Sequence, residues 1–329
     1  MLKHLADSKK NMENISAKNI ENAKVHLVLG SGGARGIAHI GVIQELQRLN
    51  CEIVSVTGSS MGAVVGGVYC TGKLDVFTDW LLSIKKKDVF SLLDFTLSTS
   101  GFIKGKKILH TLEELIGKYN IEELEIPFTA VATDLSHKKE VRYKTGNLYH
   151  AIRASIGIPT LFTPLIDRDR LLIDGGILNP LPISNVKKNC ENEIVVAVNL
   201  CAKAQSSVFR LKKHEKIIRS DYFATHKNKI EHFIAEWLKK QQSEPELETP
   251  NIINILTQTI DLMQDRVTIQ TINTHKPDVL VNIRRDFAHT MDFHASEKLI
   301  NEGVRAFNSA LSNREKTLSD LDDESIYVV

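Results

Sequence analysis

The sequence predicts an α/β protein with a largely parallel central sheet and helices on both faces. Short β-branched, apolar runs recur along the chain, and segments with helical periodicity separate them. Strands that alternate with helices in this way pair in parallel and are covered on both sides. In addition, 42% of the 329 residues are hydrophobic and 25% are charged. This composition is typical of a folded globular protein and excludes wholesale disorder, a collagen-like repeat or a small disulfide-stapled scaffold.

Six buried strands are expected from short runs of β-branched and aliphatic residues. The first run ends in a glycine, and the second leads directly into a turn rich in glycine and serine. The expected strands are 25–30, 53–57, 128–133, 171–174, 194–200 and 279–283.

Helices are expected where apolar residues recur three or four positions apart. After the first strand, for example, Ile37, Ile40 and Leu46 fall mostly on one side of such a helix. The expected helices are 33–49, 61–69, 108–119, 147–156, 252–264 and 296–311. Together with the strands they predict a three-layer domain with a helical C-terminal extension.

Changes in composition divide the chain into five expected parts. They are a flexible polar N-terminal arm (1–23), a main domain (24–201), a basic helical insertion or lid (202–250), a helix–strand–helix unit that completes the fold (251–312) and a polar tail (313–329).

The insertion is the most basic part of the chain. Residues 202–241 contain ten Lys or Arg and four Asp or Glu, a net charge of +6. Apolar residues with helical spacing form one stripe, namely Ile230, Phe233, Ile234, Trp237 and Leu238. We favour a stripe that packs on the core, because every surface helix needs one. The alternative is a lid or anchor whose stripe meets lipid while its lysines meet anionic headgroups.

The overall charge and hydropathy exclude further classes. The chain has 42 Lys or Arg against 40 Asp or Glu, and its aromatic content is 6%, so it carries no footprint of nucleic-acid binding. No apolar run reaches the ~18 residues of a membrane-spanning helix. The N-terminus lacks the apolar stretch of a secretory signal. We therefore expect a cytoplasmic protein, with peripheral membrane contact through 202–241 and export without a cleavable signal as open alternatives.

The cysteines favour free thiols in a reducing compartment. Cys51, Cys70, Cys190 and Cys201 are scattered and form no CxxC pair, and the sequence contains no metal-ligand cluster. We therefore expect buried thiols, no bound metal and no cofactor.

The first candidate motif is GSSMG at 58–62, a G-x-S-x-G pattern. It lies where the second strand turns into the next helix, which is the position of a nucleophile elbow. There Gly58 and Gly62 would relieve crowding around a strained Ser60, and the helix N-terminus would favour developing negative charge. Taken alone, the motif fits a glycine-rich turn with a capping serine equally well. Ser59 is expected to be a bystander.

The second candidate motif is GSGGARG at 30–36, between the first strand and the following helix. Glycines there leave backbone N–H groups free to face an anion, as in an oxyanion hole. The dinucleotide pattern G-x-G-x-x-G fails because Arg35 takes the place of the third glycine. A tight turn is the alternative.

The third candidate motif is DGG at 174–176, which ends the fourth strand. The Asp174 carboxylate is a candidate general base for a serine, although an ordinary Asp-Gly turn explains the motif when it is taken alone. Among the histidines, His39 is expected to be packed or hydrogen-bonded within its helix. His289 and His294, late in the chain, are the alternative bases.

Together the three motifs resemble the patatin-like phospholipase family in kind, order and approximate spacing. Three further blocks, 131–135, 151–160 and 174–182, are similar to bacterial members of the family. The resemblance covers about residues 25–200, with a weaker likeness in 277–283 and at Asp292-Phe293. Ser31 departs from the glycine that many members carry, and the insertion 202–250 is not covered.

The resemblance implies a Ser–Asp dyad and a glycine-rich oxyanion loop. Ser60 would be the nucleophile and Asp174 its base, with Gly175 and Gly176 as the turn glycines behind the base. The oxyanion donors would be the N–H groups of Gly32, Gly33 and Ala34, in a loop supported by Arg35.

The implied activity is that of a serine acyl-ester hydrolase of phospholipids or lysophospholipids, which works through an acyl-enzyme and needs no metal. An esterase, thioesterase or acyltransferase for soluble acyl substrates, without membrane engagement, is the alternative and would use the same residues. A non-enzymatic binding protein on a degenerate fold is disfavoured, because all three expected catalytic elements are present.

Overall fold

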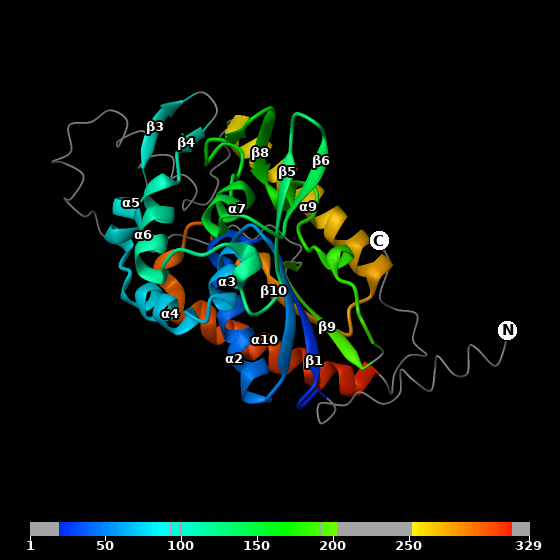
Figure 1. The fold of residues 1–329 in the computed structure, drawn as a ribbon. Coiled ribbons are helices and arrows are strands. Elements are labelled where there is room, and N and C mark those ends of the chain that lie inside the picture. Colours follow the sequence, from blue (N-terminus) through cyan, green and yellow to red (C-terminus); the bar gives the residue numbers. More distant parts are fainter. Residues whose placement is uncertain (1–19, 93, 99–100, 191, 203–251, 318–329) are drawn as a thin grey trace, which may run out of the picture.

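The computed structural model describes residues 20–92, 94–98, 101–190, 192–202 and 252–317 (Figure 1). The expected basic insertion and its apolar stripe lie outside these residues apart from Ala202, as do most of the N-terminal arm and the end of the tail. The last residues of the expected arm are packed. Ile20 is fully buried, and its carbonyl accepts a hydrogen bond from the Cys51 thiol at 3.1 Å. The folded body therefore begins before residue 24.

All six expected strands belong to one mostly parallel, eight-stranded sheet. Its order is β10 (Val279–Arg284), β9 (Glu193–Ala202), β1 (Lys24–Leu29), β2 (Glu52–Ser59), β5 (Phe128–Asp134), β8 (Arg170–Asp174) and β7 (Leu165–Asp167), and β6 (Lys139–Tyr143) pairs with β5. The strands from β10 to β5 are parallel, whereas β6, β7 and β8 pair antiparallel. A separate antiparallel pair consists of β3 (Phe95–Ser98) and β4 (Gly101–Ile103).

Strand β5 carries two different partners on one of its edges. β2 pairs with its first half, where Ser59 lies opposite Val131, and β8 pairs with its second half, where Asp174 lies opposite Ala132. Because β6 overlaps both pairings, it must occupy the other edge. β2 is parallel to β5 and β8 is antiparallel, so β2 and β8 run toward each other and end at adjacent positions.

Helices cover both faces of this sheet. The expected helix 33–49 begins as a 3-10 turn, η2 (Gly33–Ile37), and continues as α2 (Ala38–Arg48). The other α-helices are α3 (Met61–Cys70), α4 (Leu74–Ser83), α5 (Lys86–Leu92), α6 (Lys106–Ile116), α7 (Leu148–Ser155), α9 (Ile252–His275) and α10 (Ser296–Thr317). Short 3-10 turns are η3 (Ile121–Glu123), η4 (Gly175–Ile177), η5 (Ile183–Asn185), η7 (Arg285–Phe287) and η8 (Phe293–Ala295). None of the helices within the described ranges is both long enough and apolar enough to cross a bilayer.

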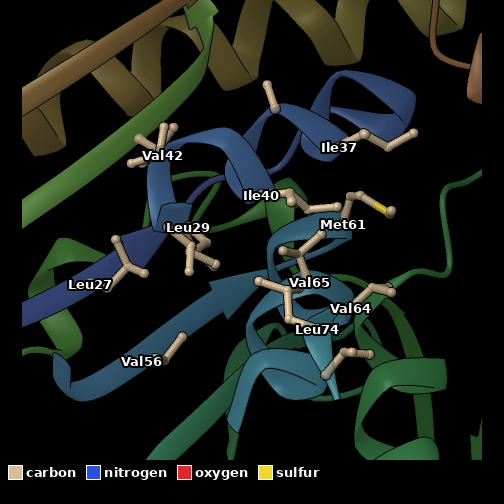
Figure 2. Close-up of a cluster of buried hydrophobic side chains, with 14 of the residues drawn as sticks. Leu27, Leu29, Ile37, Ile40, Val42, Val56, Met61, Val64, Val65 and Leu74 are labelled. Atoms are coloured by element: carbon tan, nitrogen blue, oxygen red, sulfur yellow. The ribbon is translucent and has the colours of Figure 1, made fainter. Parts of the chain in front are cut away.

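Alternate residues of the central strands face the two helical layers. In β1, Leu27 and Leu29 join the larger core with α2, α3 and α10, whereas Val28 joins a smaller cluster that includes Ile272 of α9. Figure 2 shows the larger core, where Leu29 lies among side chains of α2 and α3. This period of two, with both faces buried, is that of a central strand between two layers. The predicted three-layer α/β architecture is confirmed.

The cysteines are all free thiols, as expected, but only two are buried. Cys70 and Cys201 lie in the interior, Cys51 is half-buried and Cys190 is exposed. The expectation of burial is therefore wrong for Cys190, which lies in a polar connection just before β9.

Helices α2 and α10 pack with their backbones in close approach through two glycines. A Cβ on Gly303 of α10 would overlap the carbonyl oxygen of Ala38, and a Cβ on Gly41 of α2 would overlap the carbonyl oxygen of Ile300. Neither obstacle is a side chain that can rotate away. This contact joins the C-terminal helix to the first helix of the domain.

We expect Gly303→Ala to lower the free energy of unfolding by about 3 kcal/mol, because the added methyl group forces the two helix backbones apart. Urea denaturation followed by circular dichroism measures the change. Ser309→Ala, on the exposed side of the same helix, is the matched control and should unfold like the wild type. Equal stability of the two variants would show that the close approach is not a constraint.

Candidate active site

Ser60 occupies a strained turn between β2 and α3. Its φ of 56° and ψ of −125° lie outside the regions that side chains favour, a conformation that costs about 1–3 kcal/mol. The Ser60 N–H donates to the Ser155 hydroxyl at 2.9 Å, and that hydroxyl donates to the Val131 carbonyl at 2.5 Å. Ser155, the last residue of α7, thus ties the turn to strand β5. Sequence reasoning noted Ser155 only as part of a similar block and missed this contact.

Both glycines of the GSSMG motif lie where the backbone is crowded. A Cβ on Gly58 would overlap the Gly62 carbonyl, and a Cβ on Gly62 would overlap the Leu29 carbonyl. The turn therefore packs directly against the end of β1, which leaves no room for a side chain at either position.

Asp174 meets Ser60 from the opposite strand. The Ser60 hydroxyl donates to Asp174 Oδ2 at 2.5 Å, and the Gly176 N–H donates to Asp174 Oδ1 at 2.7 Å. The Asp174 side chain is buried, and this burial raises the pKa of its carboxyl to about 7, although the two hydrogen bonds act in the opposite direction. Gly175 is crowded as well, because a Cβ there would overlap the Val131 carbonyl.

The glycine-rich loop lies beside Ser60, and Gly33 and Ser60 line the same cavity. Gly33 has a left-handed φ of 57°, and a Cβ on it would lie 2.5 Å from the Thr290 methyl group. The Ala34 N–H donates to the Thr290 carbonyl at 2.9 Å. Within the described residues, the N–H groups of Gly32 and Gly33 make no hydrogen bond. Two of the three expected oxyanion donors are therefore open, whereas the third is engaged.

Arg35 holds this loop against two other segments. It is only 5% exposed, and it donates to the carbonyls of Leu200 at 3.2 Å, Ala288 at 2.9 Å and Arg285 at 3.3 Å. Burial lowers the pKa of its guanidinium. Because its partners are carbonyls, Arg35 acts as a brace between the loop, the end of β9 and the segment after β10.

A second arginine continues this brace to α9. Arg285 donates to Asp261 Oδ1 at 2.7 Å and to Asp265 Oδ1 at 2.5 Å. The chain of contacts thus runs from α9 through Arg285 to Arg35 and the glycine-rich loop. No sequence motif indicated Arg285. It lies 250 residues after Arg35 in the chain, and only the fold brings the two residues into contact.

The candidate histidines do not contact the dyad. His39 is fully buried, and burial lowers its pKa to about 4. Its Nε2–H donates to the Gly30 carbonyl at 2.9 Å. A neutral ring beside a carbonyl oxygen must donate, so His39 supports the loop. His289 and His294 are exposed, and no hydrogen bond joins either to Ser60 or Asp174.

An apolar cavity of about 100 Å³ opens beside Ser60. Its walls come from α3, α4, α5, α6, α7 and the segment before α10, and include Phe77, Leu81, Leu112 and Phe293. Apart from Ser60 and Thr290, the lining side chains are aliphatic, aromatic or methionine. Sequence reasoning did not predict this cavity, because it predicted neither α4 nor α5. No group of three His, Cys, Asp or Glu side chains in the described part of the chain is arranged to hold a metal ion.

A serine elbow on a three-layer α/β fold, opening on an apolar cavity, is typical of serine ester hydrolases. Residues 27–186 match the family model described as Patatin-like phospholipase. The Mycobacterium tuberculosis protein named "Uncharacterized NTE family protein Rv1063c" is 33% identical over 342 residues, which cover 92% of this chain and 93% of that protein. The chain belongs to the patatin-like phospholipase family, among its NTE family proteins, and is a lipid ester hydrolase.

Two eukaryotic proteins share a shorter region. Lysophospholipase NTE1 of Cryptococcus neoformans is 32% identical over 189 residues, 55% of this chain and 11% of that protein. Neuropathy target esterase sws of Drosophila persimilis is 35% identical over 164 residues, 48% of this chain and 11% of that protein. The likeness to these two therefore concerns one part of much longer chains.

The buried Asp174 carboxyl makes stability fall as pH rises. Its pKa is near 7 in the folded protein and near 4 in the unfolded chain, so the folded state keeps a proton that the unfolded state releases. The stabilisation is complete below pH ~4 and is lost as pH rises through ~7. We expect Asp174→Asn to gain about 2 to 3 kcal/mol relative to the wild type between pH 5 and pH 8.

Urea denaturation of both proteins across that pH range measures the difference. Subtracting the two curves removes the contributions of all other titrating groups. A difference that is constant with pH would contradict a raised pKa for Asp174.

Proposed function

We propose that the chain is a serine hydrolase of phospholipid or lysophospholipid acyl esters, with Ser60 as nucleophile and Asp174 as general base. The observation that carries the proposal is the 2.5 Å hydrogen bond from the Ser60 hydroxyl to a buried carboxyl beside an apolar cavity. The names lysophospholipase and esterase, carried by two relatives, support the same class of substrate.

Asp174 would move one proton in each half of the reaction. As Ser60 Oγ attacks the ester carbonyl, its proton passes to Asp174 Oδ2, and the leaving alcohol then takes that proton. Water attacks the acyl-enzyme in the same way, and the fatty acid leaves as Ser60 regains its proton. A base with a pKa of about 7 is about half ionised at neutral pH, and positioned proton transfer of this kind contributes ~10²–10⁴-fold.

The oxyanion would be held by the N–H groups of Gly32 and Gly33. Both are open, and Gly33 borders the cavity beside Ser60. Because the Ala34 N–H donates to Thr290, we assign Ala34 to the anchoring of the loop instead. The loss of one such donor typically reduces the rate ~10²–10³-fold.

The cavity would take the acyl chain. Its apolar walls offer no partner to a headgroup, whereas a hydrocarbon chain loses nothing by leaving water there. Its formation needs the segment before α10, so we propose that the catalytic unit comprises 24–201 together with 251–312.

Ser60→Ala should abolish hydrolysis and labelling by a fluorophosphonate serine probe, because the attacking oxygen is lost. Asp174→Asn should slow labelling ~10²-fold or more, because an amide cannot accept the proton. Wild-type labelling should accelerate as pH rises through about 7, since only the carboxylate is a base. Gel fluorescence after timed exposure measures all three.

Ser59→Ala is the matched control for these variants. The Ser59 hydroxyl is buried and lacks a hydrogen-bond partner in the described structure, so its removal should leave labelling unchanged. Full labelling of Ser60→Ala would overturn the assignment of the nucleophile. Normal labelling of Asp174→Asn would overturn the assignment of the base.

We further propose that Arg285 positions the glycine-rich loop through Arg35. Arg285→Gln, which loses both ion pairs to α9, should lower kcat on the order of 10-fold with little change in KM, because the donors shift while the cavity stays. Steady-state kinetics with a soluble acyl ester measures the two constants.

Asp261→Asn combined with Asp265→Asn should cause the same loss, and adding Arg285→Gln to it should cause no further loss. Arg305→Gln is the control, since it removes the ion pair between the exposed Arg305 and the buried Glu302 of α10, neither of which is hydrogen-bonded to the glycine-rich loop in the described structure. If Arg285→Gln lowers the melting temperature and leaves kcat unchanged, Arg285 only stabilises the fold and does not position the loop.

A further inference from the structure

Six exposed lysines flank helix α5, three at each of its ends. Lys85, Lys86 and Lys87 lie at its N-terminal end. Lys104, Lys106 and Lys107 lie at the start of α6, which is held against the other end of α5. The link is Asp94, whose carboxylate accepts the N–H groups of Gly105 at 2.6 Å and of Lys106 at 2.9 Å. Figure 1 shows α5 and α6 together at one end of the molecule. We call these six residues the lysine rim.

The lysine rim lies next to residues that line the apolar cavity. Val89 of α5 and Leu109 of α6 line the cavity, and Lys86 and Lys106 precede them by three residues, which places each lysine on the same helix face one turn earlier. On α6 the cavity residue Leu109 is half-buried, whereas Leu112, one turn further along, is buried. On α5, Val89 is buried and Leu92, at the end held against the start of α6, is half-buried. The cavity therefore approaches the surface where the end of α5 meets the start of α6, beside Lys104, Lys106 and Lys107.

The charge of this region is unbalanced. From residue 85 to residue 107 the sequence contains six lysines and two aspartates, a net charge of +4, whereas the whole chain has a net charge of +2. Both aspartates accept backbone N–H groups, Asp88 from Lys85 at 3.0 Å and Asp94 from the start of α6. Leu82, just before the rim, is 49% exposed and adds an apolar group to this surface.

We propose that the lysine rim docks on a bilayer surface that contains anionic phospholipids and so brings the cavity opening to the lipid. Lysines beside an apolar opening are complementary to an anionic headgroup layer over hydrocarbon. The use of the cavity for an acyl chain rests on the proposed function, whereas the docking itself does not. Each lysine near such a surface strengthens binding about 5-fold at low ionic strength, and salt weakens the effect.

The test is sedimentation with vesicles of phosphatidylcholine alone or of phosphatidylcholine mixed with phosphatidylglycerol. All proteins are full-length and carry Ser60→Ala, so that no lipid is consumed. The rim variant combines Lys85→Gln, Lys87→Gln, Lys104→Gln and Lys106→Gln. The matched control makes the same change of charge at four exposed lysines away from the rim, Lys138, Lys139, Lys187 and Lys276.

We expect the parent protein and the control to bind the mixed vesicles, to release them as salt is raised, and to bind pure phosphatidylcholine far more weakly. At low ionic strength the rim variant should bind the mixed vesicles roughly 600-fold more weakly, at the same melting temperature. Equal loss in the control would overturn the proposal in favour of a general effect of charge. Binding of the rim variant at the parental level would overturn it too, and would direct attention to another surface such as the basic segment 202–241.

The result is separable from the proposed function. Sedimentation needs no catalysis, so failure of the probe to label Ser60 in the wild-type chain would remove the assigned nucleophile and leave the docking result intact. Conversely, loss of vesicle specificity with normal labelling would leave the hydrolase and remove only the docking surface.

Discussion

The candidate active site depends on strand β5, because two strands that approach from opposite directions end on the same edge of it. β2 arrives in parallel and stops opposite Val131, and β8 arrives antiparallel and stops opposite Ala132. The residues at this junction, Ser60 and Asp174, are 114 positions apart in the chain and 2.5 Å apart in space. The ladder of backbone hydrogen bonds thus sets their separation, and a register shift of one residue would turn Asp174 to the opposite face of the sheet.

Because β2 and β8 end next to each other, the space at their junction is very small, and the residues around it must be small or lack a side chain. Gly175 passes over the Val131 carbonyl and Gly62 over the Leu29 carbonyl, where any Cβ would overlap an oxygen atom. The strained backbone of Ser60 is held by Ser155, whose hydroxyl also bonds Val131. Conformations this costly persist only where several contacts determine them together. The C-terminal part of the chain supplies further contacts through Thr290 and Arg285, so it belongs to the site although it lies far from the motifs in sequence.

Much of this could be predicted from the sequence, and the failures have physical reasons. The six expected strands are short, mostly apolar runs, and in β1 and β9 both faces are buried, which makes such runs distinctive. The alternation of strands and helices does not encode direction, however, so the antiparallel course of β8 was not foreseen. Strands β6 and β7 are short and lie outside the buried part of the sheet. Helix α9 continues past residue 264 through β-branched residues such as Val267 and Ile269, whose weak helix propensity is outweighed by packing on β9.

The site residues also divide into those that local sequence motifs predict and those that only the fold brings together. Ser60, Asp174 and the loop glycines lie in local motifs that turn chemistry dictates, and the structure brings them together. The partner of the Ala34 N–H is a carbonyl 256 residues later, and the brace from Arg35 to Arg285 spans 250 residues, so no local pattern reports either contact. The cavity likewise depends on α4 and α5, whose apolar residues signal burial without revealing that they surround a space.

Within the described residues no cation contacts the dyad, and the charge balance of the proposed reaction does not require one. The Asp174 carboxylate is neutralised as the ester oxygen becomes an oxyanion, so the buried site carries one negative charge before and during the attack. The charge moves from Asp174 to the loop within one buried environment, and the protein needs donors at both ends rather than a compensating positive charge. Gly176 supplies a donor at the first end and the open N–H groups of Gly32 and Gly33 lie at the second. Arg35 is consistent with this balance. Its guanidinium donates to carbonyl oxygens behind the loop, so it positions the loop and does not neutralise the dyad.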